Sequence, residues 1–198
     1  STSKSMLDTY VLEPFLNSQG IRRIDYVFVS HADSDHINGI IGLIENDADR
    51  IGTLMLPQSQ SSKKQFEQLL TAAKKKQIPV KWISKGDVFS LKTLPDLSFE
   101  VLWPSKNEKS DDTNESSLVW RLNYHDFSML FTGDLPGDCE DELVSLKPVT
   151  VLKVAHHGSD YSTTKTFLQQ ITPQLAVISC SENNRYGHPG KQLLKRLE

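Results

Sequence analysis

The chain has 198 residues, of which 37% are hydrophobic, and its formal net charge is -3. This length and apolar content suffice for a well-buried core, and we expect a single domain over residues 1–198 with no linker inside it. The charge excludes a broadly basic body that holds nucleic acid through counterion release. The longest apolar runs, such as TLMLP and VTVLKVA, are too short to cross a membrane.

The first part of the chain alternates helix and strand signals. Residues 7–19 place five apolar side chains on one helical face, and Gly20 follows as a typical C-cap. Further along, we expect a strand over residues 24–30, a helix from Ile37, a strand over 53–56, a Lys-rich helix over 62–77 and short strands near Val80 and Val88.

The second part continues the alternation. LSFEVLW (97–103) has the period of a half-buried strand, and a polar loop follows it. Residues 117–134 predict a hairpin that turns at His125 and Asp126. We then expect a helix over 137–146, a strand over 149–155, a helix over 163–171, a strand over 175–180 and a last helix from Pro189. The whole pattern predicts an α/β fold.

Three of the expected strands run directly into polar clusters, at residues 31–36, 156–159 and 182–188. Five of the six histidines lie in these clusters, and the sixth, His125, lies at a hairpin tip. A single histidine is commonly a surface residue or a hydrogen-bonded core residue. Ligand sites in α/β folds lie beyond the carboxyl ends of strands, so we expect the three clusters to converge on one site.

The first cluster has the pattern of a metal site. His31, Asp33 and Asp35 follow one another at every second position, and His36 comes next. Imidazole and carboxylate ligands together suit zinc, manganese or iron. The alternative is that Asp33 or Asp35 only caps the helix that follows, but capping does not require the two histidines.

The other clusters each have a simpler alternative. Asp134 follows an expected strand and is either a ligand or a turn residue that bonds its own backbone. Ser159, with the glycine before it, is expected to open toward a helix N-terminus, whose backbone amides could hold a phosphate. Asn184 and Arg185 either face a substrate or belong to a surface turn.

Four motifs, HADSDH (31–36), FTGD (131–134), AHHGS (155–159) and YGHP (186–189), resemble the metallo-β-lactamase superfamily and, within it, the nuclease-like domain of ComEC competence proteins. The superfamily signature is HxHxDH after a strand, and Asp33 stands here in place of the second histidine. The resemblance implies a four-layer αββα sandwich with a two-metal site at the sheet edge. We expect the first N-terminal strands to be missing and the chain to be a fragment of a larger membrane protein.

The resemblance also assigns ligands to two divalent ions. The implied metal ligands are His31 and Asp33 for one ion, Asp35, His36 and His188 for the other, Asp134 as a bridge, and Asn114 in place of an absent third-motif histidine. Because carboxylates replace imidazoles, manganese is preferred, with zinc and magnesium as alternatives. The implied catalytic residues are Asp35, through the ion it binds, and His156 or His157 as general acid.

The resemblance implies a metal-dependent phosphodiesterase or nuclease that degrades one DNA strand during DNA uptake. The expected partners are DNA, held by weak local contacts, and a parent membrane channel domain. The expected location is the extracellular side of a bacterial cell membrane, without insertion of this segment. Two alternatives remain, because this fold hosts many chemistries: a hydrolase of a thioester, lactone or phosphocholine ester, and a non-catalytic module that guides DNA.

Overall fold

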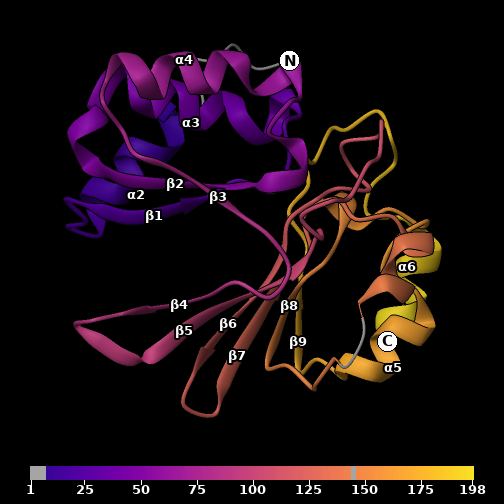
Figure 1. Ribbon diagram of the computed structural model, residues 1–198. Coiled ribbons are helices and arrows are strands. Elements are labelled where there is room, and N and C mark those ends of the chain that lie inside the picture. Colours follow the sequence, from indigo (N-terminus) through magenta and orange to yellow (C-terminus); the bar gives the residue numbers. More distant parts are fainter. Residues whose placement is uncertain (1–7, 144–145) are drawn as a thin grey trace. The chain divides into compact units, whose positions relative to one another are not determined.

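A computed structural model describes residues 8–143 and 146–198 of the chain. The chain divides into two compact units, one that ends at Ile83 and one that begins at Ser84. Each unit has its own β-sheet (Figure 1). The expectation of one domain over residues 1–198 stays a prediction, since a domain can comprise two compact units.

The first unit contains a three-stranded parallel sheet in the order β1-β2-β3. The strands are β1 (Ile24–Phe28), β2 (Ile51–Pro57) and β3 (Val80–Ile83). The helices are α2 (Glu13–Ser18), α3 (Ser34–Asp47) and α4 (Glu67–Lys75). Single turns of other helix types are η1 (Asp8–Leu12, π), and the 3-10 turns η2 (Ala48–Arg50), η3 (Gln58–Gln60) and η4 (Lys64–Phe66).

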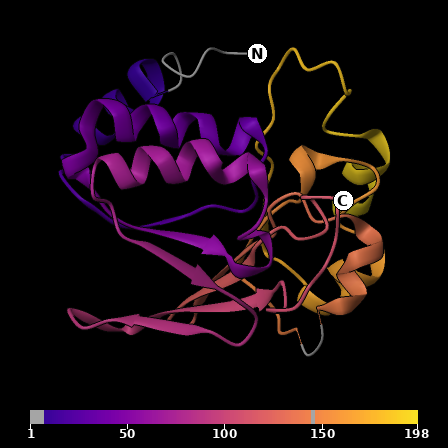
Figure 2. The ribbon, with the colours of Figure 1, turned by 45° about the horizontal axis from the view of Figure 1, so that its top comes forward.

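Helices α3 and α4 lie side by side over the sheet of the first unit (Figure 2). Ile37, Ile41 and Ile44 recur at the helical period on α3 and are buried in the core. Helix α3 begins at Ser34, three residues before the expected start. The expected helix over 7–19 is η1 and α2, and residue 7 of that prediction lies outside the described part of the chain.

The second unit contains a six-stranded sheet in the order β4-β5-β6-β7-β8-β9. Strands β4 to β7 pair antiparallel, whereas β7, β8 and β9 pair parallel. The strands are β4 (Val88–Leu91), β5 (Leu94–Trp103), β6 (Val119–Tyr124), β7 (Phe127–Phe131), β8 (Val151–Lys153) and β9 (Leu175–Val177). The helical segments are η5 (Gly137–Glu142, 3-10), η6 (His156–Gly158, 3-10), α5 (Lys165–Ile171) and α6 (Lys191–Leu197).

The expected hairpin at His125 and Asp126 is confirmed, because β6 and β7 pair directly on either side of these two residues. Other expectations need correction. The helix expected over 137–146 is the 3-10 helix η5, whose sequence offers few apolar side chains for an α-helical face, and residues 144–145 lie outside the description. Strand β9 ends at Val177 rather than at residue 180, and α6 begins at Lys191 rather than at Pro189.

Buried polar contacts hold the loop over residues 159–164 in the second unit. The Glu140 carboxylate accepts hydrogen bonds from the amide of Thr163 and from the amide and hydroxyl of Thr164. On the other side, the Arg196 guanidinium donates to the carbonyls of Asp160, Ser162 and Thr163. This loop follows the AHHGS motif directly, so these contacts support the segment that carries its histidines.

Candidate functional site

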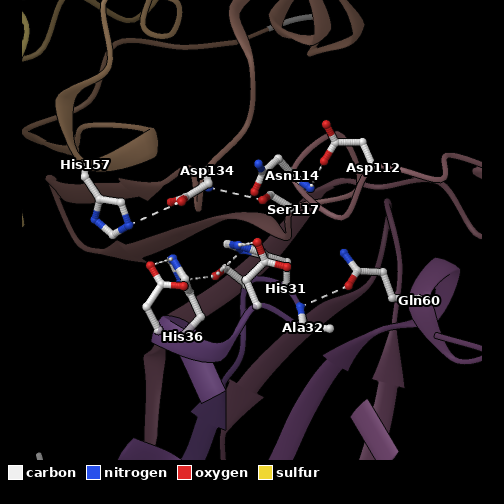
Figure 3. Close-up of polar contacts among 12 residues, drawn as sticks. His31, Ala32, His36, Gln60, Asp112, Asn114, Ser117, Asp134 and His157 are labelled. Atoms are coloured by element: carbon white, nitrogen blue, oxygen red, sulfur yellow. Dashed lines mark hydrogen bonds and ion pairs between the residues drawn. The ribbon is translucent and has the colours of Figure 1, made fainter. Parts of the chain in front are cut away.

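In the first unit, residues 31–33 lie between β1 and α3, and residues 34–36 form the first turn of α3. The side chain of His31 is fully buried. The amide of Ala32 donates a hydrogen bond of 3.2 Å to the Oε1 atom of Gln60, which is also fully buried (Figure 3). These contacts fix the main chain of the segment at its first residues.

The two histidines of this segment share the hydroxyl of Ser30. Its Oγ atom lies 3.1 Å from Nδ1 of His31 and 3.0 Å from Nδ1 of His36. A hydroxyl has one proton to donate and accepts with its lone pairs, so it can serve both rings at once. Because both Nδ1 atoms face Ser30, the Nε2 atoms are the ones in position for ligation.

Each Nε2 atom lies near an aspartate. His31 Nε2 is 3.8 Å from Oδ2 of Asp33, and His36 Nε2 is 3.8 Å from Oδ2 of Asp35. Both distances are too long for hydrogen bonds. Two donor atoms that each lie about 2.1 Å from a zinc-sized ion are at most about 4.2 Å apart, so both pairs fit a shared ion.

The capping alternative is not supported for Asp33. Asp33 occupies the N-cap position of α3 with an extended backbone, but its side chain makes no capping hydrogen bond. Its side chain is 41% exposed and that of Asp35 is 64% exposed. Both carboxylates are therefore accessible from solvent while their histidine neighbours are mostly buried.

In the second unit, Asp134 comes three residues after the end of β7 and is only 4% exposed. Its amide donates to the Oγ atom of Ser117 at 3.1 Å, and its Oδ2 atom lies 3.3 Å from Nε2 of His157 (Figure 3). The turn alternative requires the aspartate side chain to bond the amide two residues further on. That residue is Pro136, which has no N–H group, so this bond cannot form.

The ring of His157 is held at one end by a main-chain carbonyl. Its Nδ1 atom lies 2.8 Å from the carbonyl oxygen of Ser179. Because a carbonyl only accepts hydrogen bonds, Nδ1 carries the proton, and in the neutral ring Nε2 is left with a lone pair. Metal-ligating histidines in proteins commonly show this arrangement, with one ring nitrogen bonded to a carbonyl and the other directed at the metal.

The remaining two histidines of the motifs lie close together in the same unit. The ring centroids of His156 and His188 are 6.0 Å apart, and the ring of Tyr186 stacks on that of His188 at 5.8 Å and 17°. Burial lowers the pKa of His188, and the neighbouring His156 and His157 lower it further. A lowered pKa favours the neutral imidazole, which is the form that binds metal ions.

Asn114 has a buried oxygen that suits the ligand role inferred for it. Its Oδ1 atom is buried and has no hydrogen-bond partner among the residues that the structure describes. The main-chain carbonyl of Asn114 accepts a hydrogen bond from the amide of Ser117, and the hydroxyl of Ser117 accepts one from the amide of Asp134. Buried polar atoms are rarely left without a partner, so an ion or an ordered water is the expected complement of this oxygen.

The three expected substrate residues have different surroundings. Ser159 is buried, and its hydroxyl accepts a hydrogen bond from the amide of Tyr161. The helix toward which it is expected to open is α5, which begins at Lys165 with Thr164 as its N-cap. Arg185 is exposed and bonds the hydroxyl of Tyr186, and Asn184 bonds atoms of its own loop. Their roles toward a substrate stay predictions.

Sequence reasoning missed four supporting residues: Ser30, Ser117, Ser179 and Lys153. The Nζ atom of Lys153 donates to the carbonyl of Gly133 at 3.2 Å, and burial lowers the pKa of this lysine although the Asp134 charge opposes the shift. Ser30 could have been found, because it directly precedes the first motif. Ser179 carries no signal, since any residue could supply the carbonyl that it provides. Ser117 and Lys153 carry none either, because their partners lie far away in the sequence.

Comparison with known proteins places the chain in a family. A family model described as "Beta-lactamase superfamily domain" matches residues 3–160. The chain belongs to the beta-lactamase superfamily. Among solved structures, the metallo-beta-lactamase fold protein YhfI from Bacillus subtilis is similar, with a TM-score of 0.56, 12% identity, and coverage of 94% of this chain and 75% of that one. This likeness confirms the predicted fold class, and the sheet with helices in each unit agrees with the layers of an αββα sandwich.

Relatives of this superfamily chain include competence proteins. It is 36% identical to ComE operon protein 3 of Bacillus subtilis over 95% of its own length, and 32% identical to competence protein ComA of Neisseria gonorrhoeae over 93%. It spans about a quarter of the length of these relatives, 24% in both cases. Within residues 8–143 and 146–198, every helix falls short of the length and hydrophobicity that a membrane crossing requires.

Proposed function

We propose that this chain is a metal-dependent phosphodiesterase domain that cleaves DNA and degrades one strand during DNA uptake. The observation that carries the proposal is the donor set, in which histidine and aspartate atoms lie 3.3 to 3.8 Å apart in three pairs. The similarity to ComE operon protein 3 and ComA supports a role in competence. Carboxylate-rich metal sites are typical of enzymes that hydrolyse phosphate esters.

We propose that the chain binds two divalent ions. The proposed ligands are His31, Asp33, Asp35, His36, Asn114, Asp134, His157 and His188. The abundance of oxygen donors favours manganese over zinc, with magnesium as a further alternative. When bound, such ions supply a water that ionises near neutral pH and stabilise negative charge on the phosphoryl oxygens.

The geometry of the two adjacent histidines supports different roles for them. The Nδ1 atom of His157 donates a hydrogen bond to the carbonyl of Ser179, and its Nε2 atom lies beside Asp134. This arrangement favours a ligand role for His157. His156 is then the proposed general acid that donates a proton to the leaving oxygen. Loss of a general acid slows a reaction about 100- to 10,000-fold without removing the metal, whereas loss of a ligand weakens metal binding itself.

The proposed DNA contacts are few and local. The chain carries a net charge of -3, so electrostatic attraction to a phosphate backbone is weak overall. Arg185 and Tyr186 are exposed beside His188 and offer a positive charge and an aromatic face. We propose that a membrane channel in the parent protein delivers the strand on the extracellular side.

The test uses the chain loaded with Mn²⁺, Mg²⁺ or Zn²⁺ and offered single-stranded and double-stranded DNA, a thioester, a lactone and a phosphocholine ester. We expect DNA cleavage with Mn²⁺ or Mg²⁺. Asp134→Asn should abolish cleavage and weaken metal binding, whereas Asp138→Asn, at an exposed position a few residues away, should change neither.

Two outcomes would overturn the proposal. Cleavage of another ester with DNA left intact would identify a different metallo-hydrolase. DNA binding without any turnover, in a chain that holds its metal, would identify a module that guides DNA.

A further inference from the structure

The side chain of Asn184 makes four hydrogen bonds within the loop that follows β9. Its Oδ1 atom accepts from the amide of His188 at 2.8 Å and from the amide of Tyr186 at 3.2 Å. Its Nδ2 atom donates to the carbonyl of His188 at 2.6 Å and to that of Ser181 at 2.7 Å.

These four bonds use the whole capacity of the side chain. A carboxamide has one oxygen with two acceptor lone pairs and one nitrogen with two N–H groups. All four positions of Asn184 are engaged within its own loop. The side chain can therefore contact a substrate only if it gives up one of these bonds, which argues against the substrate role expected from the sequence.

Two of the bonds fix the main chain of His188 on both sides, at its N–H and at its carbonyl. The base of the same loop is held by a hydrogen bond of 2.8 Å from the amide of Gly190 to the carbonyl of Gly158. The ring of His188 thus leaves a fixed backbone, and it lies between the rings of Tyr186 and His156 at centroid distances of 5.8 and 6.0 Å.

We infer that Asn184 is a positioning residue that sets the direction of the His188 imidazole. The inference rests on the proposed function only for the consequence that His188 binds a metal ion. Without the carboxamide, the polar main-chain atoms of His188 would turn to water, and Gly187, with φ at +72°, would leave the loop free to move. Loss of a group that orients a ligand lowers metal affinity about 10- to 100-fold.

The experiment compares Asn184→Ala with Gln192→Ala, which removes an exposed carboxamide from the first turn of α6. In the metal-free protein, NMR should show that only Asn184→Ala shifts and broadens the ring signals of His188 and speeds exchange of its amide proton. Calorimetry with Mn²⁺ should show about 10- to 100-fold weaker binding in Asn184→Ala and no change in Gln192→Ala. The KM for DNA should stay unchanged.

A second variant protects the test against loss of folding. Asn184→Asp keeps the oxygen that accepts the His188 amide and loses the two donated bonds, so the amide should stay protected while the ring signals still shift. The inference is overturned if Asn184→Ala leaves the His188 signals unchanged, or raises the KM for DNA with metal affinity unchanged. If the wild-type protein binds no metal, the proposed function fails, whereas the ring and amide signals of His188 still decide whether Asn184 positions it.

Discussion

Replacing Glu140 with alanine is expected to lower the free energy of unfolding by about 3 kcal/mol. The Glu140 side chain is 4% exposed and accepts hydrogen bonds of 2.5 and 2.8 Å from the amides of Thr163 and Thr164 and of 2.7 Å from the Thr164 hydroxyl. A hydrogen bond to a charged group contributes about 1.5 to 3 kcal/mol. Part of this gain offsets the cost of burying the carboxylate, since burial raises its pKa.

The assay is urea unfolding followed by circular dichroism. Glu142→Ala, at an exposed position in the same 3-10 helix, is the matched control and should change the free energy of unfolding by no more than about 0.5 kcal/mol. Glu140→Gln should fall between the two, because its oxygen still accepts while its amide N–H₂ group faces the threonine donors. If Glu140→Ala is no less stable than Glu142→Ala, these hydrogen bonds do not hold the loop and the reasoning is refuted.

Three further predictions concern pH, thiol chemistry and backbone conformation. The folded pKa of Glu140 lies above its ordinary value of 4.5, so its contribution to stability is fully present below pH 4.5 and is lost as the pH rises through the folded pKa. The deficit of Glu140→Ala should therefore shrink as the pH of urea titrations is raised above 4.5, and a deficit that grows with pH would contradict the sign. Burial, with help from nearby acidic groups, raises the pKa of Cys139 to about 11, so about one thiol in a thousand is ionised at pH 8. A thiol reagent should label the exposed Cys180 quickly and Cys139 only after unfolding. Rapid labelling of two thiols per folded chain would refute this prediction. Gly158→Ala should lower the free energy of unfolding by about 1 to 3 kcal/mol more than Gly20→Ala does. Both glycines have a positive φ, but of the two only Gly158 has atoms of the described chain close to an added Cβ, the nearest at 2.9 Å. Equal losses of melting temperature in the two variants would show that the contact at Gly158 relaxes.

Several features of the fold follow from local sequence patterns. The apolar period of α3, the two-residue turn at His125 and Asp126, and the polar motifs after β1, β7 and β8 are all visible in the sequence, because each depends on residues close together in the chain. The motif at residues 31–36 already contains both histidines and both aspartates of the first unit's donor pairs.

Other features depend on contacts that no local pattern encodes. Glu140 bonds residues more than twenty positions away, and the partner of His157 is a main-chain carbonyl, which every residue has. The pattern around Asn184 predicts a turn or a substrate contact, but only the fold shows that its carboxamide is fully used by its own loop. Helix α5 begins at Lys165, two residues after the expected start, because Thr164 is its N-cap.

The parallel pairing of β7, β8 and β9 indicates which loop could be changed to alter the proposed activity. The segments that follow these three strands leave the same edge of the sheet, but they differ in how closely the strands control them. Asp134 comes a few residues after β7 and His157 a few residues after β8, whereas His188 stands at the far side of a long loop. If the proposed activity holds, exchange of the exposed part of that loop should admit a different leaving group, provided that the hydrogen bonds of Asn184 to His188 are kept. Natural variation in the same part of the loop would then change the substrate of the proposed enzyme while the proposed ligands on the shorter segments stay in place.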